Sequence, residues 1–90
     1  MKKSLTIKLY GLVQGVFFRD AVAKKAFELG VTGFVENQPD GTVVVVAEGD
    51  EVSLKELLNW SKCGPEFAQV EKVENQWTNA TSAYENFQVK

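Results

Sequence analysis

One short segment near the N-terminus carries residue types that can bind an anion. It reads Gly11-Leu12-Val13-Gln14-Gly15-Val16-Phe17-Phe18-Arg19. The first backbone N–H groups of a helix lack intrahelical acceptors and lie at the positive end of the helix dipole. If residues 14–18 curl over the start of a helix, their N–H groups can converge on an anion. Gly15 permits the tight curl that this cradle requires.

Arg19, at the end of this segment, adds a permanent positive charge. Its guanidinium is planar and can bind two phosphoryl oxygens at once. Arg19 is also the only arginine among ten basic side chains, so lysines supply the rest of the positive charge. The alternative is that Arg19 forms an ordinary surface salt bridge with Asp20, Glu36 or Glu48. A salt bridge to one of these carboxylates in the folded chain would favour the second interpretation, and a guanidinium without such a partner would favour anion binding.

The composition excludes several kinds of chemistry. The chain has 90 residues, no histidine, and Cys63 as its only cysteine. It therefore cannot build a Ser-His-Asp or Cys-His nucleophile, a histidine-ligated metal site, a cysteine zinc cage or an internal disulfide. Twelve acidic side chains against ten basic ones give a formal net charge of −2, which disfavours nucleic acid as a partner. Any catalysis must use carboxylates, amides, lysines, the arginine or the backbone.

Length and hydropathy favour one small domain over residues 1–90. Hydrophobic residues make up 44% of the chain, which suits a folded core. No stretch approaches the ~18 consecutive apolar residues of a membrane span. The apolar residues after the basic N-terminus are interrupted by Thr6 and Lys8, so they indicate a strand and not a signal peptide. We expect a soluble, cytoplasmic monomer.

Hydrophobic periodicity predicts the elements of the first half of the chain. Leu5, Ile7 and Leu9 alternate with polar residues, as in a half-buried strand. From Phe18 the apolar spacing becomes helical, and Gly30 is typical of a helix end. Four consecutive valines then follow a Gln-Pro-Asp-Gly turn and indicate a central strand. The expected elements are a strand over 5–10, a helix over 18–29, a strand over 31–36, a turn over 38–41 and a strand over 42–47.

The second half predicts a helix and two less regular strands. The helix starts after Asp50 or Ser53 and is stopped by Gly64-Pro65. Val70 and Val73 fit a strand only if it contains a bulge, and Trp77 ends it. A short last strand follows near Phe87. Together these elements predict an α+β protein with the ferredoxin-like βαββαβ plait. It has an antiparallel sheet, two helices on one face and a short extra C-terminal strand.

Two long segments resemble the signatures of a known family. Leu9-Tyr10-Gly11-Leu12-Val13-Gln14-Gly15-Val16-Phe17-Phe18-Arg19 resembles the first signature of the acylphosphatases. Gly33-Phe34-Val35-Glu36-Asn37-Gln38-Pro39-Asp40-Gly41-Thr42-Val43 resembles the second. The resemblance extends from about Leu5 to Val89. It implies the ferredoxin-like fold and the hydrolysis of acyl phosphates to a carboxylate and inorganic phosphate.

The resemblance also implies roles for particular residues. It places the catalytic arginine at Arg19 and the catalytic asparagine at Asn37. It places the phosphate-binding loop, which would hold a phosphate or sulfate ion, at five consecutive residues: Gln14, Gly15, Val16, Phe17 and Phe18. Consecutive residues diverge in direction, so we expect one of the two phenylalanines in the core and the other at the mouth of the loop.

One position departs from the family pattern. Glu36 stands beside Asn37, where the second signature usually has a basic, small or uncharged residue. An acidic side chain facing the site could repel an anionic substrate. Because side chains alternate across a strand, Glu36 and Asn37 should point to opposite faces. We therefore expect Glu36 to have a small effect.

An acyl phosphate suits this set of residues. Its leaving group is a carboxylate, whose conjugate acid has a pKa of roughly 4, so no strong general acid is needed. Arg19 and the loop amides would neutralise the phosphoryl charge, and Asn37 would orient an in-line water. No cofactor or metal is then required. Asp20, Asp40 and Glu48 could be imagined as a magnesium site, but pairing and turn roles suit them better.

The fold alone leaves a second class of function open, because the same plait also carries ligand-sensing and RNA-binding modules. The alternative is therefore a non-catalytic ligand- or RNA-binding module. An RNA-recognition domain would place aromatic side chains on its two central strands. Residues 42–47 offer valines there instead.

Overall fold

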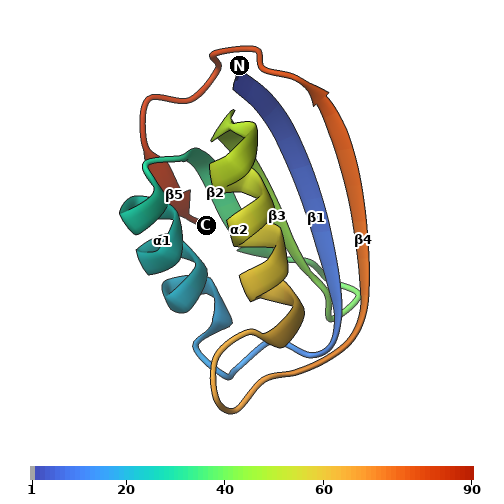
Figure 1. Cartoon of the computed structure of the whole chain (residues 1–90). Coiled ribbons are helices and arrows are strands. Elements are labelled where there is room, and N and C mark those ends of the chain that lie inside the picture. The colour runs from blue at the N-terminus through green and yellow to red at the C-terminus, as the bar shows by residue number, and fades with distance from the viewer. Residues whose placement is uncertain (1) are drawn as a thin grey trace.

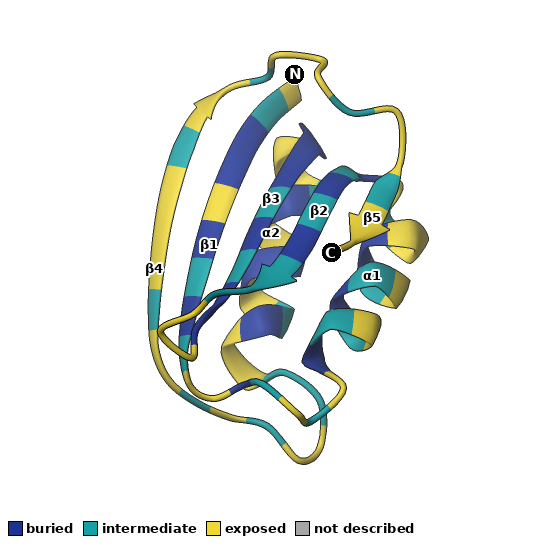
Figure 2. Ribbon diagram, turned by 180° about the vertical axis from the view of Figure 1, so that it is seen from behind, coloured by how far each residue is buried: buried dark blue, intermediate teal, exposed yellow. Residues whose placement is uncertain are grey.

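Five strands and two helices form a sheet with helices on one side (Figure 1). The computed structural model describes residues 2–90. The strand order is β4-β1-β3-β2-β5, and α1 and α2 pack on one face, leaving the other face open in Figure 2. This arrangement confirms the ferredoxin-like plait. The elements are β1 (Lys2–Leu12), α1 (Phe18–Leu29), β2 (Thr32–Asn37), β3 (Val43–Asp50), α2 (Glu51–Cys63), β4 (Gln69–Asn79) and β5 (Phe87–Val89).

The core lies between the helices and the sheet. The alternating residues of β1 and the corresponding residues of β3 are buried on the helix side, and each buried aliphatic side chain contributes about 1.5–3 kcal/mol. β3 pairs with β1 on one side and β2 on the other, so the valine-rich segment is the central strand, as predicted. The fully buried side chains include Leu5, Ile7, Leu9, Val22, Val35, Val43, Val45, Leu54 and Leu57. No helix within residues 2–90 is long and apolar enough to cross a membrane.

The fifth strand corrects one expectation. The sheet was predicted to be antiparallel, but β5 pairs in parallel with β2, from Gly33 opposite Phe87 to Val35 opposite Val89. The reason is topological. β4 runs opposite to β2 and finishes level with the first residues of β2, at the same end of the strands, so a segment that enters from there and pairs beside β2 runs in the same direction as β2 (Figure 1). The sheet is therefore mixed.

The predicted bulge in β4 is confirmed. Tyr10 pairs with Lys72, whereas Gly11 pairs with Val70, so one extra residue of β4 lies between these two pairs. The shift places Val70 and Val73, three residues apart, against the same core. β4 continues past Trp77 to Asn79, because β1 begins earlier than predicted and supplies pairing partners for those residues.

The start of α1 is fixed by an aromatic contact with α2. Phe18 is 1% exposed, and its ring lies 6.0 Å from that of Trp60 in an edge-to-face arrangement. The chain just after α2 also passes close by, since a Cβ at Gly64 would lie 2.5 Å from the Phe18 ring. Asp50 precedes α2, as expected, but makes no side-chain capping hydrogen bond. Phe17, which precedes α1, likewise makes no side-chain capping hydrogen bond, so the start of α1 depends on packing at Phe18.

A buried carboxylate ties the connection between β4 and β5 to the central strand. Glu48 on β3 is 5% exposed, and its Oε2 accepts hydrogen bonds from the backbone N and Oγ1 of Thr81, both at 2.8 Å. The hydrogen bond from the Thr81 backbone is the main cause that holds the pKa of Glu48 below its ordinary value. The residues after β4 are thereby anchored before the chain enters β5.

This carboxylate predicts a pH-dependent part of the stability. Glu48→Gln should lower the melting temperature at pH 7 by about 4–8 °C, since a charge-assisted hydrogen bond worth ~1 kcal/mol or more is weakened. Because the folded pKa is lowered, the stabilisation is present above the ordinary value of 4.5 and is lost as the pH falls through the folded value. The difference between the two proteins should therefore shrink between pH 5 and pH 3.

Thermal unfolding followed by circular dichroism at several pH values measures this difference. Glu56→Gln, at an exposed position of α2, is the matched control and should leave the curves unchanged. A Glu48→Gln difference of equal size at pH 7 and pH 3 would contradict the assignment.

Candidate active site

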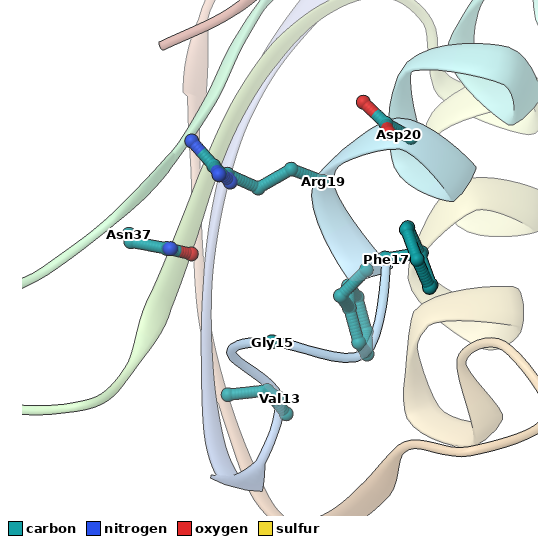
Figure 3. A pocket seen from close by; sticks show the side chains of 7 residues that line it. Val13, Gly15, Phe17, Arg19, Asp20 and Asn37 are labelled. Atoms are coloured by element: carbon teal, nitrogen blue, oxygen red, sulfur yellow. The ribbon is translucent and has the colours of Figure 1, made fainter.

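A pocket of about 260 Å³ lies at the start of α1. Its lining comes from the β1–α1 loop, the first residues of α1 and the last residue of β2. Figure 3 shows Arg19 crossing the pocket toward the side where Asn37 lies. The structure thus brings together two side chains that are far apart in sequence. The lining residues are Val13, Gly15, Phe17, Phe18, Arg19, Asp20 and Asn37.

The guanidinium of Arg19 is held by the main chain of Lys90. Its Nη1 donates a hydrogen bond of 2.8 Å to the backbone carbonyl of Lys90. The Lys90 N–H in turn donates to the carbonyl of Val35 on β2, also at 2.8 Å. The salt bridges found within residues 2–90 are Lys8–Asp40, Lys55–Glu51 and Lys72–Glu74, so the surface salt bridge considered for Arg19 is wrong. No side-chain carboxylate among residues 2–90 forms a salt bridge with the guanidinium.

The loop before α1 exposes a run of backbone donors. Gly15 and Phe17 both have left-handed backbones, with φ of 75° and 61°. The first helical hydrogen bond runs from Ala21 N–H to the Phe17 carbonyl, and in the described part of the chain the N–H groups of residues 14–20 find no protein acceptor. A left-handed bulky residue such as Phe17 is strained, by about 1–3 kcal/mol, and such strain is concentrated at functional sites. Concave runs of N–H groups of this kind bind anions.

Gln14 holds this loop in place. Its Nε2 donates to the carbonyls of Gln38 and Thr42, at 2.8 and 2.9 Å. Thr42 is itself fixed, because its N–H and Oγ1 both donate to Oδ1 of Asp40. These two bonds, with a smaller contribution from Lys8, lower the pKa of Asp40 to about 2, so the carboxylate stays charged at neutral pH. The side chain of Gln14 is therefore engaged by the β2–β3 turn.

Asn37 carries an unusual polar atom. Its Oδ1 is buried and has no hydrogen-bond partner among residues 2–90. Leaving a buried acceptor unpaired costs about 1–3 kcal/mol, and in native proteins such a group usually has a ligand, a water or a catalytic role. The neighbouring Glu36 instead accepts a hydrogen bond from Nε2 of Gln38 at 3.1 Å and does not contribute to the pocket lining.

The predicted site residues fall into two groups. Gly15, Phe17, Phe18, Arg19 and Asn37 line the pocket. Gln14 and Val16 support the loop instead, the first through the turn and the second by packing against the core. The expected divergence of the two phenylalanines is confirmed, since Phe17 is 77% exposed and Phe18 is 1% exposed.

Three groups at the site were not predicted. Val13 lines the pocket, and its only sequence signal is its place in the anion-binding segment. Asp20 also lines it, and its signal is its position directly after Arg19. The third group is the carbonyl of Lys90. Every residue has a backbone carbonyl, so no residue type could have pointed to this one.

Comparison with known proteins identifies the family. The sequence pattern of the acylphosphatase family matches residues 5–89, nearly the whole chain. The chain belongs to the acylphosphatase family. A curated acylphosphatase from Caldanaerobacter subterraneus subsp. tengcongensis is 46% identical over 89 residues, which is 99% of both chains.

Solved structures agree with this assignment. The acylphosphatase from Bacillus subtilis superposes with a TM-score of 0.94 at 30% identity, over 98% of both chains. The acylphosphatase from Coxiella burnetii superposes with a TM-score of 0.92 at 38% identity, over 99% of this chain and 93% of the other. The protein is therefore an enzyme that hydrolyses acyl phosphates. These comparisons give no support to a non-catalytic ligand- or RNA-binding module.

The anchoring of the loop by Gln14 gives a first kinetic prediction. Gln14→Ala should lower kcat/KM for benzoyl phosphate about thirtyfold, because two hydrogen bonds that hold the loop are lost at roughly 1 kcal/mol each. Gln14→Glu should behave similarly, since a carboxylate cannot donate to two carbonyls. Steady-state kinetics measures both variants, with Gln76→Ala on the exposed edge strand β4 as the control. Unchanged rates in both Gln14 variants would show that the turn does not position the loop.

Proposed function

We propose that the pocket at the start of α1 is the active site and that it works without a metal ion. In this mechanism Arg19 and the N–H groups of residues 15–18 bind the phosphoryl group, and a water held by Asn37 attacks phosphorus in line with the acyl oxygen. One observation supports this best. A guanidinium without a side-chain carboxylate partner, a run of unpaired N–H groups and a buried, unpaired Asn37 oxygen belong to one pocket within residues 2–90.

The positive groups of the pocket match the charge of the transition state. Phosphoryl transfer spreads negative charge over the equatorial oxygens, and preorganised donors stabilise that charge without having to reorganise. The loop is fixed by Gln14, and the guanidinium is fixed by the Lys90 carbonyl. Both groups are therefore in place before substrate arrives.

Asn37 orients the nucleophile and does not deprotonate it. An amide oxygen accepts a hydrogen bond from water, and the amide NH₂ donates to water or phosphate, but neither takes up a proton at neutral pH. The proton of the attacking water passes to a phosphoryl oxygen. The P–O bond to the acyl group breaks, and the carboxylate leaves unprotonated, because its conjugate acid has a pKa of about 4.

The donor set of the pocket also supports metal independence. Magnesium is usually held by carboxylates and phosphate oxygens, and Asp20 is the one carboxylate in the described lining. Asp40 and Glu48 are used by the β2–β3 turn and by Thr81. Arg19 and the amides already supply the positive charge that a metal would bring.

Further properties follow from the same proposal. Inorganic phosphate and sulfate should bind the loop of residues 14–18, since each presents the tetrahedral oxygens of the substrate. We further propose a monomeric active unit, in which the lining residues 13–20 and Asn37 belong to the same chain. The exposed free thiol of Cys63 suits a reducing compartment such as the cytoplasm.

Arg19→Lys tests the arginine and the absence of a metal together. The variant should fold but lose at least about 10²–10³-fold in kcat/KM, because a point charge cannot replace the bidentate fork. Hydrolysis of benzoyl phosphate is measured in the presence of EDTA, where the unmodified enzyme should keep full activity. Lys24→Arg, exposed on the same helix, is the control. A near-normal rate for Arg19→Lys, or loss of enzyme activity in EDTA, would contradict the proposal.

Asn37→Ala tests the orientation of the water. It should reduce kcat by about 10²-fold with little change in KM, because the interaction acts on the nucleophile and not on the bound phosphate. Asn75→Ala on β4 removes an exposed amide and should leave both constants unchanged. A rise in KM alone would make Asn37 a substrate-binding group instead.

A further inference from the structure

The β2–β3 turn contacts both halves of the proposed active site. It joins Asn37, the last residue of β2, to Val43, the first residue of β3, and these two residues are partners in the sheet. The carbonyls of Gln38 and Thr42 in this turn accept both hydrogen bonds from the side chain of Gln14, in the loop before α1. The conformation of the turn therefore sets where the loop lies relative to Asn37.

Asp40 fixes this turn from outside the pocket. Its Oδ1 accepts hydrogen bonds from the backbone N–H of Thr42 at 3.1 Å and from Oγ1 of Thr42 at 2.6 Å. Thr42 is 3% exposed, and its carbonyl also accepts the N–H of Gln38 at 2.8 Å. Because a buried donor that loses its acceptor is costly, removal of the Asp40 carboxylate should displace Thr42. Asp40 itself is exposed and does not line the pocket, so any effect on turnover must pass through Thr42.

Lys8 is a second partner of Asp40, and a weaker one. Its Nζ lies 3.3 Å from Oδ2 of Asp40, but both side chains are at least one-third exposed, and ion pairs in such positions contribute little. The hydrogen bonds from the hydroxyl and the backbone of Thr42 are the main causes that lower the pKa of Asp40 to about 2, and Lys8 adds less. The contacts with Thr42 therefore hold the turn, more than the ion pair does.

We infer that Asp40 is a positioning residue for the hydrolysis of acyl phosphates. By holding Thr42, it keeps in place the two carbonyls that bind Gln14. The same contact supports the end of β2, where Asn37 lines the pocket. One carboxylate outside the pocket thus fixes the phosphate-binding loop relative to the amide that orients water. This role rests on the proposed function, which assigns the loop to the phosphoryl group and Asn37 to the water.

Two substitutions separate the hydrogen bonds of Asp40 from its charge. Asp40→Ala removes the acceptor and should lower kcat/KM for benzoyl phosphate about five- to tenfold, a loss smaller than that of Gln14→Ala. Asp40→Asn keeps an oxygen that can accept both hydrogen bonds from Thr42, and it should stay within about twofold of the unmodified enzyme. Lys8→Met removes only the ion pair and should also change kcat/KM by less than about twofold.

A double-mutant cycle tests whether Asp40 acts through Gln14. Asp40→Ala and Gln14→Ala are measured singly and together, at a temperature where circular dichroism shows every variant to be folded. Since both substitutions release the same loop, the combined loss in kcat/KM should fall at least about threefold short of the product of the single losses. If Asp40→Ala does not fold, Asp40→Ser takes its place in the cycle, because a serine hydroxyl supports the same turn more weakly.

Asp50→Ala is the matched control. Asp50 is exposed, makes no side-chain capping hydrogen bond and does not line the pocket. This variant should leave kcat/KM unchanged, and its combination with Gln14→Ala should show only the loss of Gln14→Ala.

The outcomes distinguish this inference from the proposed function. An unchanged rate in the Asp40 variant of the cycle, equal losses in Asp40→Ala and Asp40→Asn, or full additivity with Gln14→Ala would each overturn the positioning role. If any of these occurs while Arg19→Lys still abolishes most of the activity, the proposed function stands without Asp40. If Arg19→Lys leaves the rate near normal, the proposed function itself fails.

Discussion

The burial of Phe18 is the constraint on which the site depends. Phe18 is 1% exposed and packs against Trp60, and the close approach of Gly64 leaves no room for a Cβ beside its ring. A buried first residue restricts how the helix can rotate about its axis. Arg19, the next residue, lines the pocket, and Phe17, the residue before, lines it with a left-handed backbone. The geometry of the pocket is therefore coupled to core packing at Phe18.

Some polar side chains around the pocket form hydrogen bonds that fix the loop and the turn, whereas the Asn37 oxygen has no hydrogen-bond partner among residues 2–90. The amide of Gln14 donates hydrogen bonds to two carbonyls of the β2–β3 turn, and the carboxylate of Asp40 accepts two hydrogen bonds from Thr42. Arg19 is held by a hydrogen bond to the backbone oxygen of Lys90, which orients its guanidinium. The polar contacts around the pocket therefore fix the positions of both the loop and the guanidinium.

Local patterns in the sequence were enough to predict most of the architecture. The helix from Phe18, the Gln-Pro-Asp-Gly turn, the central valine strand and the bulge near Val70 all depend on residues close together in the chain. The direction of β5 could not be predicted in this way, because it depends on where β4 ends. Sequence motifs pointed to Arg19 and Asn37, and the structure places both at one pocket. The motifs could not show that Gln14 joins the loop to the turn or that the backbone of Lys90 holds Arg19. Both contacts are made to backbone oxygens, which every residue has, so the type of the accepting residue does not reveal them.

The topology explains why a pocket forms at this place. β1 and β2 are both antiparallel to β3, which lies between them, so they run in the same direction and their carboxyl ends reach the same edge of the sheet. The loop after β1 leads into α1, and β2 ends with Asn37. Ligands of open sheets that contain parallel strands bind at such carboxyl ends, where loops and helix starts meet. Here the inserted strand β3 lies between the two ends, and the β2–β3 turn supplies the acceptors for Gln14. The split arrangement thus brings the β1–α1 loop and Asn37 to one pocket and anchors the loop to the neighbouring turn.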